Sequence, residues 1–270
     1  MQIEQVETLW GPMYVFGNDT GVSQALRDFG EYGAVEVATY LRLLEPGDVF
    51  VDVGANIGAI SRAVASAGRN LSIIGFEPQP EFHRLACANL IDRERAAVYP
   101  LAVSDRAGEI RINEVDLRQV GNYGHREIEG QRATRRMVPC PTIRLDEFLA
   151  PRAPKPRLIK IDVEGMEAAV LRGLGGLVHA RLVLSVEADR PENVPAILEQ
   201  LAGFELFAAF FRMIRSGNPK FDPENEACRS RHVQLIGFAG EPPEWIRSPG
   251  YWPVRRVEDF EAAWARHIAA

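Results

Sequence analysis

Acidic residues stand at the ends of several apolar, β-branched runs of this sequence. Asp52 closes the run V-F-V, Glu77 follows S-I-I-G-F, Asp162 follows L-I-K-I, and Glu187 ends L-V-L-S-V-E. Short runs of this kind are typical of strands that are buried on both faces of a sheet. In an open α/β sheet the carboxyl ends of the parallel strands meet at one edge, where ligands bind. We therefore expect these carboxyl groups to converge on one crevice.

The first of these runs, residues 49–53, is followed by the glycine-rich turn G-A-N-I-G and then by a helix. A turn of this kind lets backbone N–H groups and a helix N-terminus approach a ligand closely. A dinucleotide fingerprint would need glycine where Asn56 stands, which argues against a dehydrogenase. The spacing D-x-G-x-x-x-G, from Asp52 through Gly54 to Gly58, instead resembles motif I of the S-adenosylmethionine-dependent methyltransferases. The resemblance implies that Asp52 lies near the methionyl ammonium of the cofactor.

Two further positions are candidates for the nucleoside part of such a cofactor. Glu77 lies about 20 residues past the glycine turn, where a carboxylate can accept hydrogen bonds from both ribose hydroxyls. A third strand is expected at residues 97–103, and it leads into Ser104 and Asp105. These two residues are candidates for the adenine pocket, although the sequence D-R-A-G is equally typical of a plain turn.

Five motifs follow one another between about residues 46 and 190: V-D-V-G-A-N-I-G, G-F-E-P, A-V-S-D-x-x-G, T-I-R-L-D-E-F and I-K-I-D-V-E-G-M-E-x-x-V-L-x-G. Together they resemble the FkbM family of methyltransferases. The resemblance implies a Rossmann-like fold, S-adenosylmethionine as cofactor, and methylation of a hydroxyl group on a polyketide, a sugar or another small molecule or glycan. Carried over by position, it implies cofactor contacts from Asp52, Gly54, Asn56, Gly58, Glu77 and Asp162.

An aliphatic hydroxyl is a poor nucleophile, so its methylation needs a nearby base or a cation that lowers the hydroxyl pKa. Asp162, Glu164 and Glu187 follow two consecutive strands, and their oxygens could bind a hard ion such as Mg²⁺. His232, at the start of the last strand, and His125 are the histidine candidates for the base. We favour a carboxylate-centred site built from Asp162, Glu164 and Glu187, with His232 as the alternative. Glu164 could also merely favour the positive N-terminus of the helix that follows it.

Residues 108–141 interrupt the alternation of strands and helices and are expected to form a substrate cap over the crevice. This insertion contains a basic patch in an otherwise acidic protein, made of Arg126, Arg132, Arg135 and Arg136. His125, Arg126 and Arg135 are our candidates for acceptor binding. A solvated, charged hairpin is the competing interpretation.

The composition is that of an ordinary globular protein, with 270 residues, 46% hydrophobic and 25% charged. A formal charge of −6 argues against a non-specific nucleic-acid binder and favours a small-molecule or glycan partner. Cys87, Cys140 and Cys228 are odd in number and far apart, which indicates reduced thiols and a cytoplasmic protein. The sequence has no signal-peptide pattern and no apolar run of the roughly 18 residues that span a bilayer. It does not indicate the oligomeric state.

The expected fold is α/β: a Rossmann-like, doubly wound, seven-stranded and mostly parallel sheet with an antiparallel last hairpin. Residues 1–45 are expected to form an N-terminal extension with a strand pair or lid, and residues 46–240 the cofactor-binding domain. Residues 241–270 are expected to form a helical tail. A helix predicted at residues 32–44 carries Glu36, which we assign to its solvated face.

Two other function classes stay open at this point. One is N-methylation of a small molecule or peptide, and the other is a non-catalytic regulator that binds the cofactor. An N-methyltransferase of nucleic acid or glutamine would be expected to carry an N-P-P-Y-like stretch after the fourth strand, where this sequence has D-V-E-G.

Overall fold

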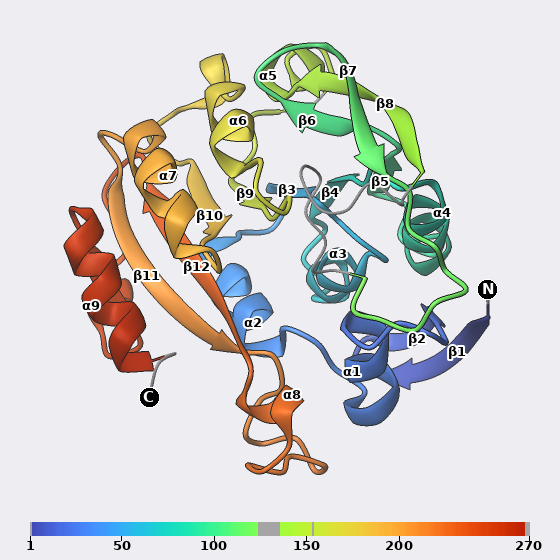
Figure 1. Ribbon diagram of the computed structural model, residues 1–270. Helices are drawn as coiled ribbons and strands as arrows, with labels where there is room; N and C mark the ends of the chain where they lie inside the picture. The colour runs from blue at the N-terminus through green and yellow to red at the C-terminus, as the bar shows by residue number, and fades with distance from the viewer. Residues whose placement is uncertain (1, 124–135, 153, 268–270) are drawn as a thin grey trace.

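The main sheet has eight strands in the part of the chain that the computed structural model describes, residues 2–123, 136–152 and 154–267. Their order across the sheet (Figure 1) is β13 (Tyr251–Val254), β11 (Glu205–Arg212), β12 (Arg231–Phe238), β10 (Val183–Glu187), β9 (Leu158–Ile161), β3 (Val49–Val53), β4 (Ser72–Phe76) and β5 (Ala96–Tyr99). The strands from β10 to β5 are parallel, and β12 lies antiparallel between β10 and β11. The predicted mostly parallel sheet with an antiparallel last hairpin is confirmed, but it has eight strands instead of the seven predicted, because β13 adds an edge strand beside β11.

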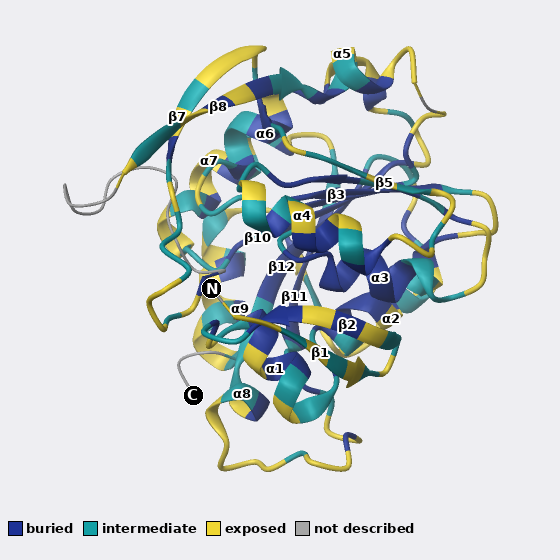
Figure 2. Cartoon of the chain, turned by 90° about the vertical axis from the view of Figure 1, so that its right-hand side faces the viewer, coloured by how far each residue is buried: buried dark blue, intermediate teal, exposed yellow. Residues whose placement is uncertain are grey.

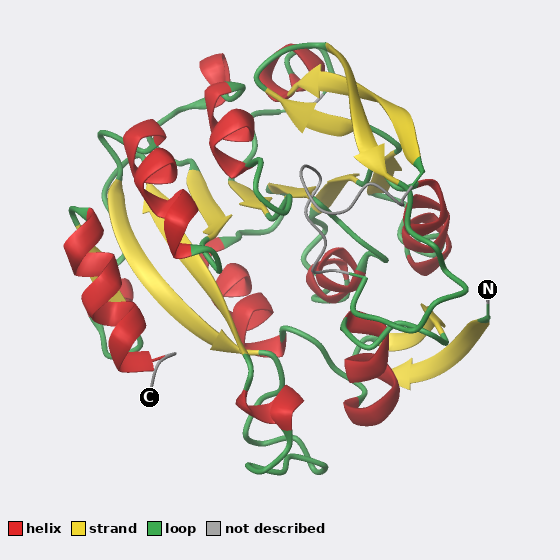
Figure 3. Ribbon diagram, in the orientation of Figure 1, coloured by secondary structure: helices red, strands yellow, loops and turns green. Residues whose placement is uncertain are grey.

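Both faces of this sheet are covered by helices (Figure 3). The strand β3 shows why, since Val49, Val51 and Val53 pack into one apolar cluster and Phe50 into another. On the face of Phe50 lie α2 (Ala34–Leu43), α3 (Ala59–Ala65) and α4 (Pro80–Asn89). On the other face lie α5 (Leu145–Leu149), α6 (Glu167–Arg172), α7 (Val194–Gln200) and α9 (Val257–His267). Figure 2 shows the central strands as the most deeply buried part of the molecule.

The chain winds in opposite directions from the middle of this sheet. It runs from β3 outward through β4 to β5, and later from β9 outward through β10. The carboxyl ends of β3 and β9 are therefore neighbours at a topological switch point, where open α/β sheets form their ligand crevice. This places Asp52 beside Lys160 in the register of the two strands.

The single third strand that we predicted at residues 97–103 is wrong. The strand β5 ends at Tyr99, and a tight turn follows in which the Leu101 N–H donates to the Tyr99 carbonyl at 2.9 Å. Pro100 at that turn has no N–H to continue a ladder. The chain then enters a separate three-stranded sheet, with the order β6 (Ala102–Ser104), β8 (Met137–Arg144) and β7 (Gly108–Asn113).

The N-terminal residues form a hairpin, β1 (Ile3–Thr8) with β2 (Gly11–Phe16), followed by α1 (Val22–Phe29). Asp19, which is buried, ties this extension to the segment after β7. Its carboxylate accepts hydrogen bonds from the N–H groups of Gly21 at 3.0 Å, Ser23 at 2.8 Å and Tyr123 at 3.1 Å. The predicted N-terminal strand pair is therefore present, and it is anchored to the insertion.

The C-terminal segment contributes a strand as well as the predicted helix. The strand β13 pairs antiparallel with β11 and becomes the edge of the sheet, so the expectation of a purely helical tail was incomplete. Between β11 and β12 the chain forms a long loop that contains α8 (Glu226–Arg229). Three short 3-10 helices complete the described elements, at Gly175–Leu177, Pro191–Asn193 and Glu244–Arg247. No helix in the described ranges is long and apolar enough to cross a membrane.

Candidate active site

A cavity of about 680 Å³ opens at the carboxyl ends of β3, β9 and β10. One part lies beneath the glycine turn and is lined by residues 54–56 and 77–79. The other part lies between α1, the start of α2, α8 and the beginning of β12, and it includes His232. Its size is that of a pocket for a drug-sized or cofactor-sized ligand. One cavity thus connects the glycine turn with His232.

The glycine turn is built around close backbone contacts. Gly54 has φ +86°, and a Cβ added there would lie 1.7 Å from the backbone oxygen of Asp162. Asn56 has φ +52°, and its side-chain oxygen accepts the Ile57 N–H at 2.7 Å. Gly58 has φ +80° and precedes α3 where that helix approaches Ala86. Glycine at residue 54 is therefore required by the neighbouring strand, before any ligand is considered.

Glu77 lines the cavity with a carboxylate whose position is held by the backbone. Its Oε2 accepts the N–H of Asn56 at 2.8 Å, and its Oε1 accepts the N–H of Gln79 at 2.9 Å. Burial raises the pKa of Glu77 to about 7, although these two hydrogen bonds oppose the shift. A carboxylate has about four acceptor positions, so Glu77 can accept two further hydrogen bonds from the cavity side. A ribose diol offers two suitable donors.

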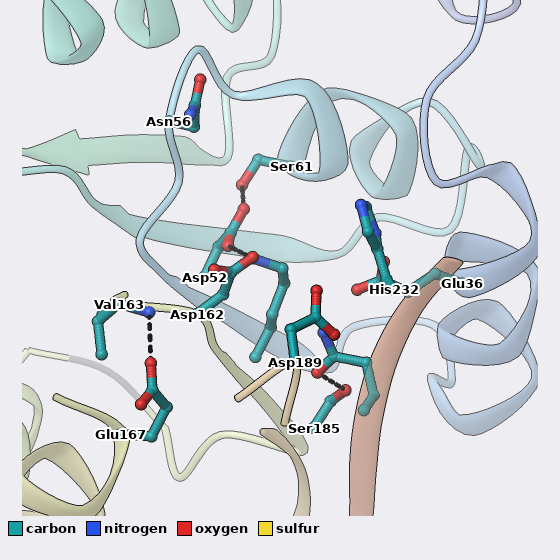
Figure 4. A network of polar contacts seen from close by, with 12 residues as sticks. Glu36, Asp52, Asn56, Ser61, Asp162, Val163, Glu167, Ser185, Asp189 and His232 are labelled. Carbon is teal, nitrogen blue, oxygen red and sulfur yellow. Dashed lines mark hydrogen bonds and ion pairs between the residues drawn. The ribbon is translucent and has the colours of Figure 1, made fainter. Parts of the chain in front are cut away.

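Asp52 does not line the cavity, although we predicted a contact with the cofactor. Its side chain is fully buried, and its Oδ2 accepts the hydroxyl of Ser61 at 2.7 Å. Its Oδ1 lies 3.4 Å from Nζ of Lys160, which donates to Oδ2 of Asp162 at 3.0 Å (Figure 4). Burial alone would lower the pKa of Lys160, but Asp162 and Asp52 outweigh it and raise that pKa. Asp52 therefore acts on the cavity through Lys160.

The three predicted carboxyl groups after β9 and β10 do converge. One oxygen each of Asp162, Glu164 and Glu187 lies within 4.8 Å of the others. Asp162 already pairs with Lys160, and Glu164 pairs with Arg190. Burial raises the pKa of Glu164 to about 8, with Asp162 adding to the shift. Burial and the charge of Asp162 also raise the pKa of Glu187 well above its usual value. The residues could hold a cation, but two of the three have protein cations as partners.

His232 lies at the centre of the second part of the cavity. Its Nδ1 is 3.2 Å from Oε2 of Glu36, and its Nε2 is 2.8 Å from the hydroxyl of Tyr32. Figure 4 shows His232 on its strand beside Glu36. Burial opposes protonation of this imidazole, but the hydrogen bond and charge of Glu36, together with Asp189, raise the pKa of His232. Its ring therefore has a stronger affinity for a proton than an exposed histidine.

Our assignment of Glu36 to a solvated face was wrong. Its side chain is 1% exposed, and its Oε1 accepts the hydroxyl of Tyr40 at 2.5 Å. The signal was present in the spacing, because Glu36, Tyr40 and Leu43 lie on one face of α2 and are all buried. Lys160 was also missed, although a lysine within an apolar strand needs a buried partner.

Two further cavity residues, Asp189 and Tyr32, contact the His232 region and were not among our predicted site residues. Asp189 accepts the Val233 N–H at 2.6 Å, and burial raises its pKa to about 6. Tyr32 has no sequence signal that separates it from a core tyrosine. The pairing of β10 with β12 places Asp189 at the site, and the turn before α2 places Tyr32 there.

Ser104 and Asp105 are not brought to the cavity. Ser104 ends β6, which has left the main sheet, and the next residue, Asp105, pairs with Arg172 at 3.1 Å. The cavity wall near Glu77 is formed instead by Phe82 and by the end of β7 at Ile112. Of the predicted basic patch, Arg136 is exposed and lies 3.7 Å from Glu114, whereas Arg126, Arg132 and Arg135 lie outside the described residues, as does His125.

Comparison with known proteins identifies the domain that contains this cavity. The model of the methyltransferase FkbM domain matches residues 52–210, which include the glycine turn and the carboxylate cluster. The chain belongs to the FkbM methyltransferase family. The predicted family is confirmed, and with it a methyltransferase domain that depends on S-adenosylmethionine.

Two characterised relatives share part of this FkbM chain. AglP, a hexuronic acid methyltransferase from Haloferax volcanii, is 30% identical over 163 residues, 58% of this chain and 63% of AglP. The chain thus matches less than two thirds of the length of AglP. NoeI, a 2-O-methyltransferase from Sinorhizobium fredii, is 28% identical over 223 residues, 71% of this chain and 89% of NoeI. Among solved structures, an S-adenosylmethionine-dependent O-methyltransferase from Thermotoga maritima has a TM-score of 0.46 and 16% identity, covering 78% of this chain and 66% of its own.

The residues of the cavity fit the cofactor of the FkbM family. Glu77 offers fixed acceptors for a diol, and Asn56 holds the turn beside it. Asp162, which also lines the cavity, remains ionised because Lys160 overcomes the effect of burial and lowers its pKa. An ionised carboxylate of this kind suits a ligand that carries an ammonium and a sulfonium charge.

Proposed function

We propose that this FkbM protein transfers the methyl group of S-adenosylmethionine to a hydroxyl oxygen of a small molecule or glycan, with a sugar hydroxyl as the acceptor. The observation that carries the proposal is the single cavity in which Glu77 and His232 both lie. Donor and acceptor can meet there without leaving the protein. AglP is a hexuronic acid methyltransferase, which supports an acceptor of the sugar class, and NoeI is a 2-O-methyltransferase, which supports an oxygen as the methylated atom.

In this proposal Glu77 binds the ribose of the cofactor. The protein backbone of the turn at Gly54, Asn56 and Gly58 contacts the cofactor, and Asp162 faces its positively charged end. When bound, S-adenosylmethionine supplies an electrophilic methyl group on a sulfonium centre. The protein aligns the acceptor oxygen with that group and excludes water, which lowers the entropic part of the barrier.

Deprotonation of the acceptor is assigned first to His232. Asp162 and Glu164 already pair with Lys160 and Arg190, so either carboxylate would have to leave its ion pair to take the acceptor proton. The raised pKa of His232 suits a base that works near neutral pH. A Mg²⁺ ion on Asp162, Glu164 and Glu187 is the second candidate, since the spacing of their oxygens favours it. Such an ion would have to compete with the two existing ion pairs.

The test is a methyl-transfer assay with the purified protein, S-adenosylmethionine, and panels of glycans and hydroxylated metabolites. S-adenosylhomocysteine formation and a methyl ether in the product would support the proposal. A methylated nitrogen would favour an N-methyltransferase. Binding of S-adenosylhomocysteine without turnover of any acceptor would favour the non-catalytic regulator.

The same assay separates the two candidates for deprotonation. It is repeated after exhaustive chelation, with Mg²⁺, Mn²⁺ and Ca²⁺ added back, and with Asp162→Asn, Glu187→Gln and His232→Ala. Full activity in chelator with an inactive His232→Ala would support the histidine. Loss of activity in chelator that Mg²⁺ restores would support the metal. Near-normal turnover of both carboxylate variants would show that the carboxylate cluster has no part in the mechanism.

A further inference from the structure

Both ring nitrogens of His232 are occupied by protein groups. Nδ1 faces the Glu36 carboxylate at 3.2 Å, and Nε2 faces the Tyr32 hydroxyl at 2.8 Å. An acceptor hydroxyl in the cavity therefore has no unoccupied nitrogen of His232 to bind. The Tyr32 hydroxyl, which meets Nε2 of His232 at 2.8 Å, itself lines the cavity and can reach an acceptor there.

Tyr32 is held in this position by its surroundings. Its ring contacts the His232 ring edge to face, with centroids 4.9 Å apart. The next residue, Gly33, has φ +67° and donates its N–H to the Met213 carbonyl at 2.9 Å, which fixes the turn before α2. The hydroxyl of Tyr32 is thus positioned from two sides, by a strand and by a loop.

The Glu36 carboxylate selects one tautomer of a neutral His232. Since a carboxylate only accepts hydrogen bonds, Nδ1 must carry the proton and donate it to Glu36. Nε2 is then an acceptor, and the Tyr32 hydroxyl donates to it. Burial, together with the charges of Asp162 and Glu36, raises the pKa of Tyr32 well above its usual value. Tyr32 therefore stays a neutral hydroxyl that can pass one proton on only as it receives another.

Resting on the proposed methyl transfer, we propose that Tyr32 is a catalytic residue that relays the proton of the acceptor hydroxyl to His232, and that Glu36 is the positioning residue of this relay. Tyr32 takes the acceptor proton while its own proton moves to Nε2 of His232. The acceptor oxygen forms its bond to the methyl carbon as the sulfur–carbon bond breaks, and that electron pair stays on sulfur. Glu36 stabilises the resulting imidazolium, which returns its proton to water after product release.

The first test compares Tyr32→Phe with Tyr14→Phe. Tyr14 is 41% exposed on β2 and lies outside the cavity, so its variant controls for the loss of a tyrosine hydroxyl. We expect Tyr32→Phe to lower kcat by about 10²–10⁴-fold, the typical contribution of a proton-transfer group, with the Kd of S-adenosylhomocysteine unchanged. Tyr14→Phe should keep wild-type kcat. A kcat of Tyr32→Phe within a factor of about three of wild type, or a change confined to KM, would overturn the relay.

The second test uses Glu36→Gln and the pH dependence of kcat. The charged groups that face His232 are Glu36 from α2, Asp189 after β10 and Asp162 after β9. Since His232 must be neutral to receive the proton, activity should rise with pH through its pKa. Removing the charge of Glu36 should lower that pKa, so the acidic limb of the profile should move to lower pH while the plateau falls. An unshifted limb would exclude Glu36 as the positioning residue.

A third measurement does not depend on turnover and so separates failure of the relay from failure of the proposed function. Nitrogen-15 NMR of the histidine rings in the unliganded protein reports which ring nitrogen carries the proton. We expect Nδ1 of His232 to be protonated and Nε2 to be an acceptor, with assignment by the His232→Ala spectrum. A neutral His232 with its proton on Nε2 would overturn the relay even if the protein methylates a hydroxyl. The expected tautomer with no methyl transfer would instead count against the proposed function.

Discussion

The close approach of Gly54 to the next strand predicts a large effect of one added methyl group. In Gly54→Ala the new Cβ would lie 1.7 Å from the backbone oxygen of Asp162, at a residue with φ +86°. Gly47 has almost the same backbone conformation, φ +87°, but a Cβ there would have nothing within 4 Å. Gly47→Ala is therefore a matched control that introduces the backbone strain without the collision.

The difference between the two variants isolates the cost of the collision. A left-handed conformation costs a residue with a Cβ about 1–2 kcal/mol, and both variants incur it. Forcing an extra carbon into a packed site adds about 1–3 kcal/mol, and only Gly54→Ala incurs this second cost. The obstructing atom belongs to the backbone beside β9 and cannot rotate away as a side chain would. We expect Gly54→Ala to lose about 2–5 kcal/mol of unfolding free energy, by adding the two costs.

Urea unfolding of both variants at 25 °C measures these losses, and calorimetry with S-adenosylhomocysteine measures the effect on the turn. Cofactor affinity should fall in Gly54→Ala, because the turn aligns the Asn56 N–H with Glu77, and should stay unchanged in Gly47→Ala. Equal loss of stability in the two variants would refute the argument from the close approach. Unchanged cofactor affinity in a destabilised Gly54→Ala would show that the turn does not contribute to cofactor binding.

Four further predictions concern the cavity and the insertion above it. Lys160→Met should lower the unfolding free energy by about 3–5 kcal/mol in urea titrations, because it leaves buried carboxylates without their cation. A loss below about 1 kcal/mol, the value for an exposed ion pair, would contradict the buried pairing of Lys160 with Asp52 and Asp162. Glu77→Ala should weaken S-adenosylhomocysteine binding by about 1.5–3 kcal/mol in calorimetry, whereas Glu81→Ala, at a half-buried residue outside the cavity, should not. The pKa of Glu77 is raised to about 7 in the folded state, whereas the unfolded chain releases this proton near the ordinary pKa of glutamate. The free energy of unfolding should therefore fall as pH rises towards 7, and Glu77→Gln should remove up to about 3 kcal/mol of this pH dependence. An identical pH dependence in the variant would refute the raised pKa. Neutralising Arg126 and Arg135 should raise the acceptor KM with little change in cofactor affinity, and unchanged kinetics would favour a solvated hairpin.

The local patterns of the sequence were sufficient for the parallel core and the glycine turn. The buried run at residues 49–53, the turn from Gly54 to Gly58 and the strand-end acid Glu77 each depend on neighbours close in the chain. Strand period, glycine conformation and strand-end position are local properties, so a single sequence carries them. The motifs for the FkbM family lie in these same segments.

The tertiary structure alone decided which polar groups meet. His232 and Glu36 are 196 residues apart, and Lys160 reaches Asp52 only because β9 lies beside β3. Helix periodicity places Glu36 on a face of α2 but does not say that the opposing strand brings a histidine. The break after Tyr99 likewise depends on the pairing of β6 with β8, far along the chain. Such long-range pairings are stabilised by burial and hydrogen bonding between distant segments, which leave no periodic trace in either segment.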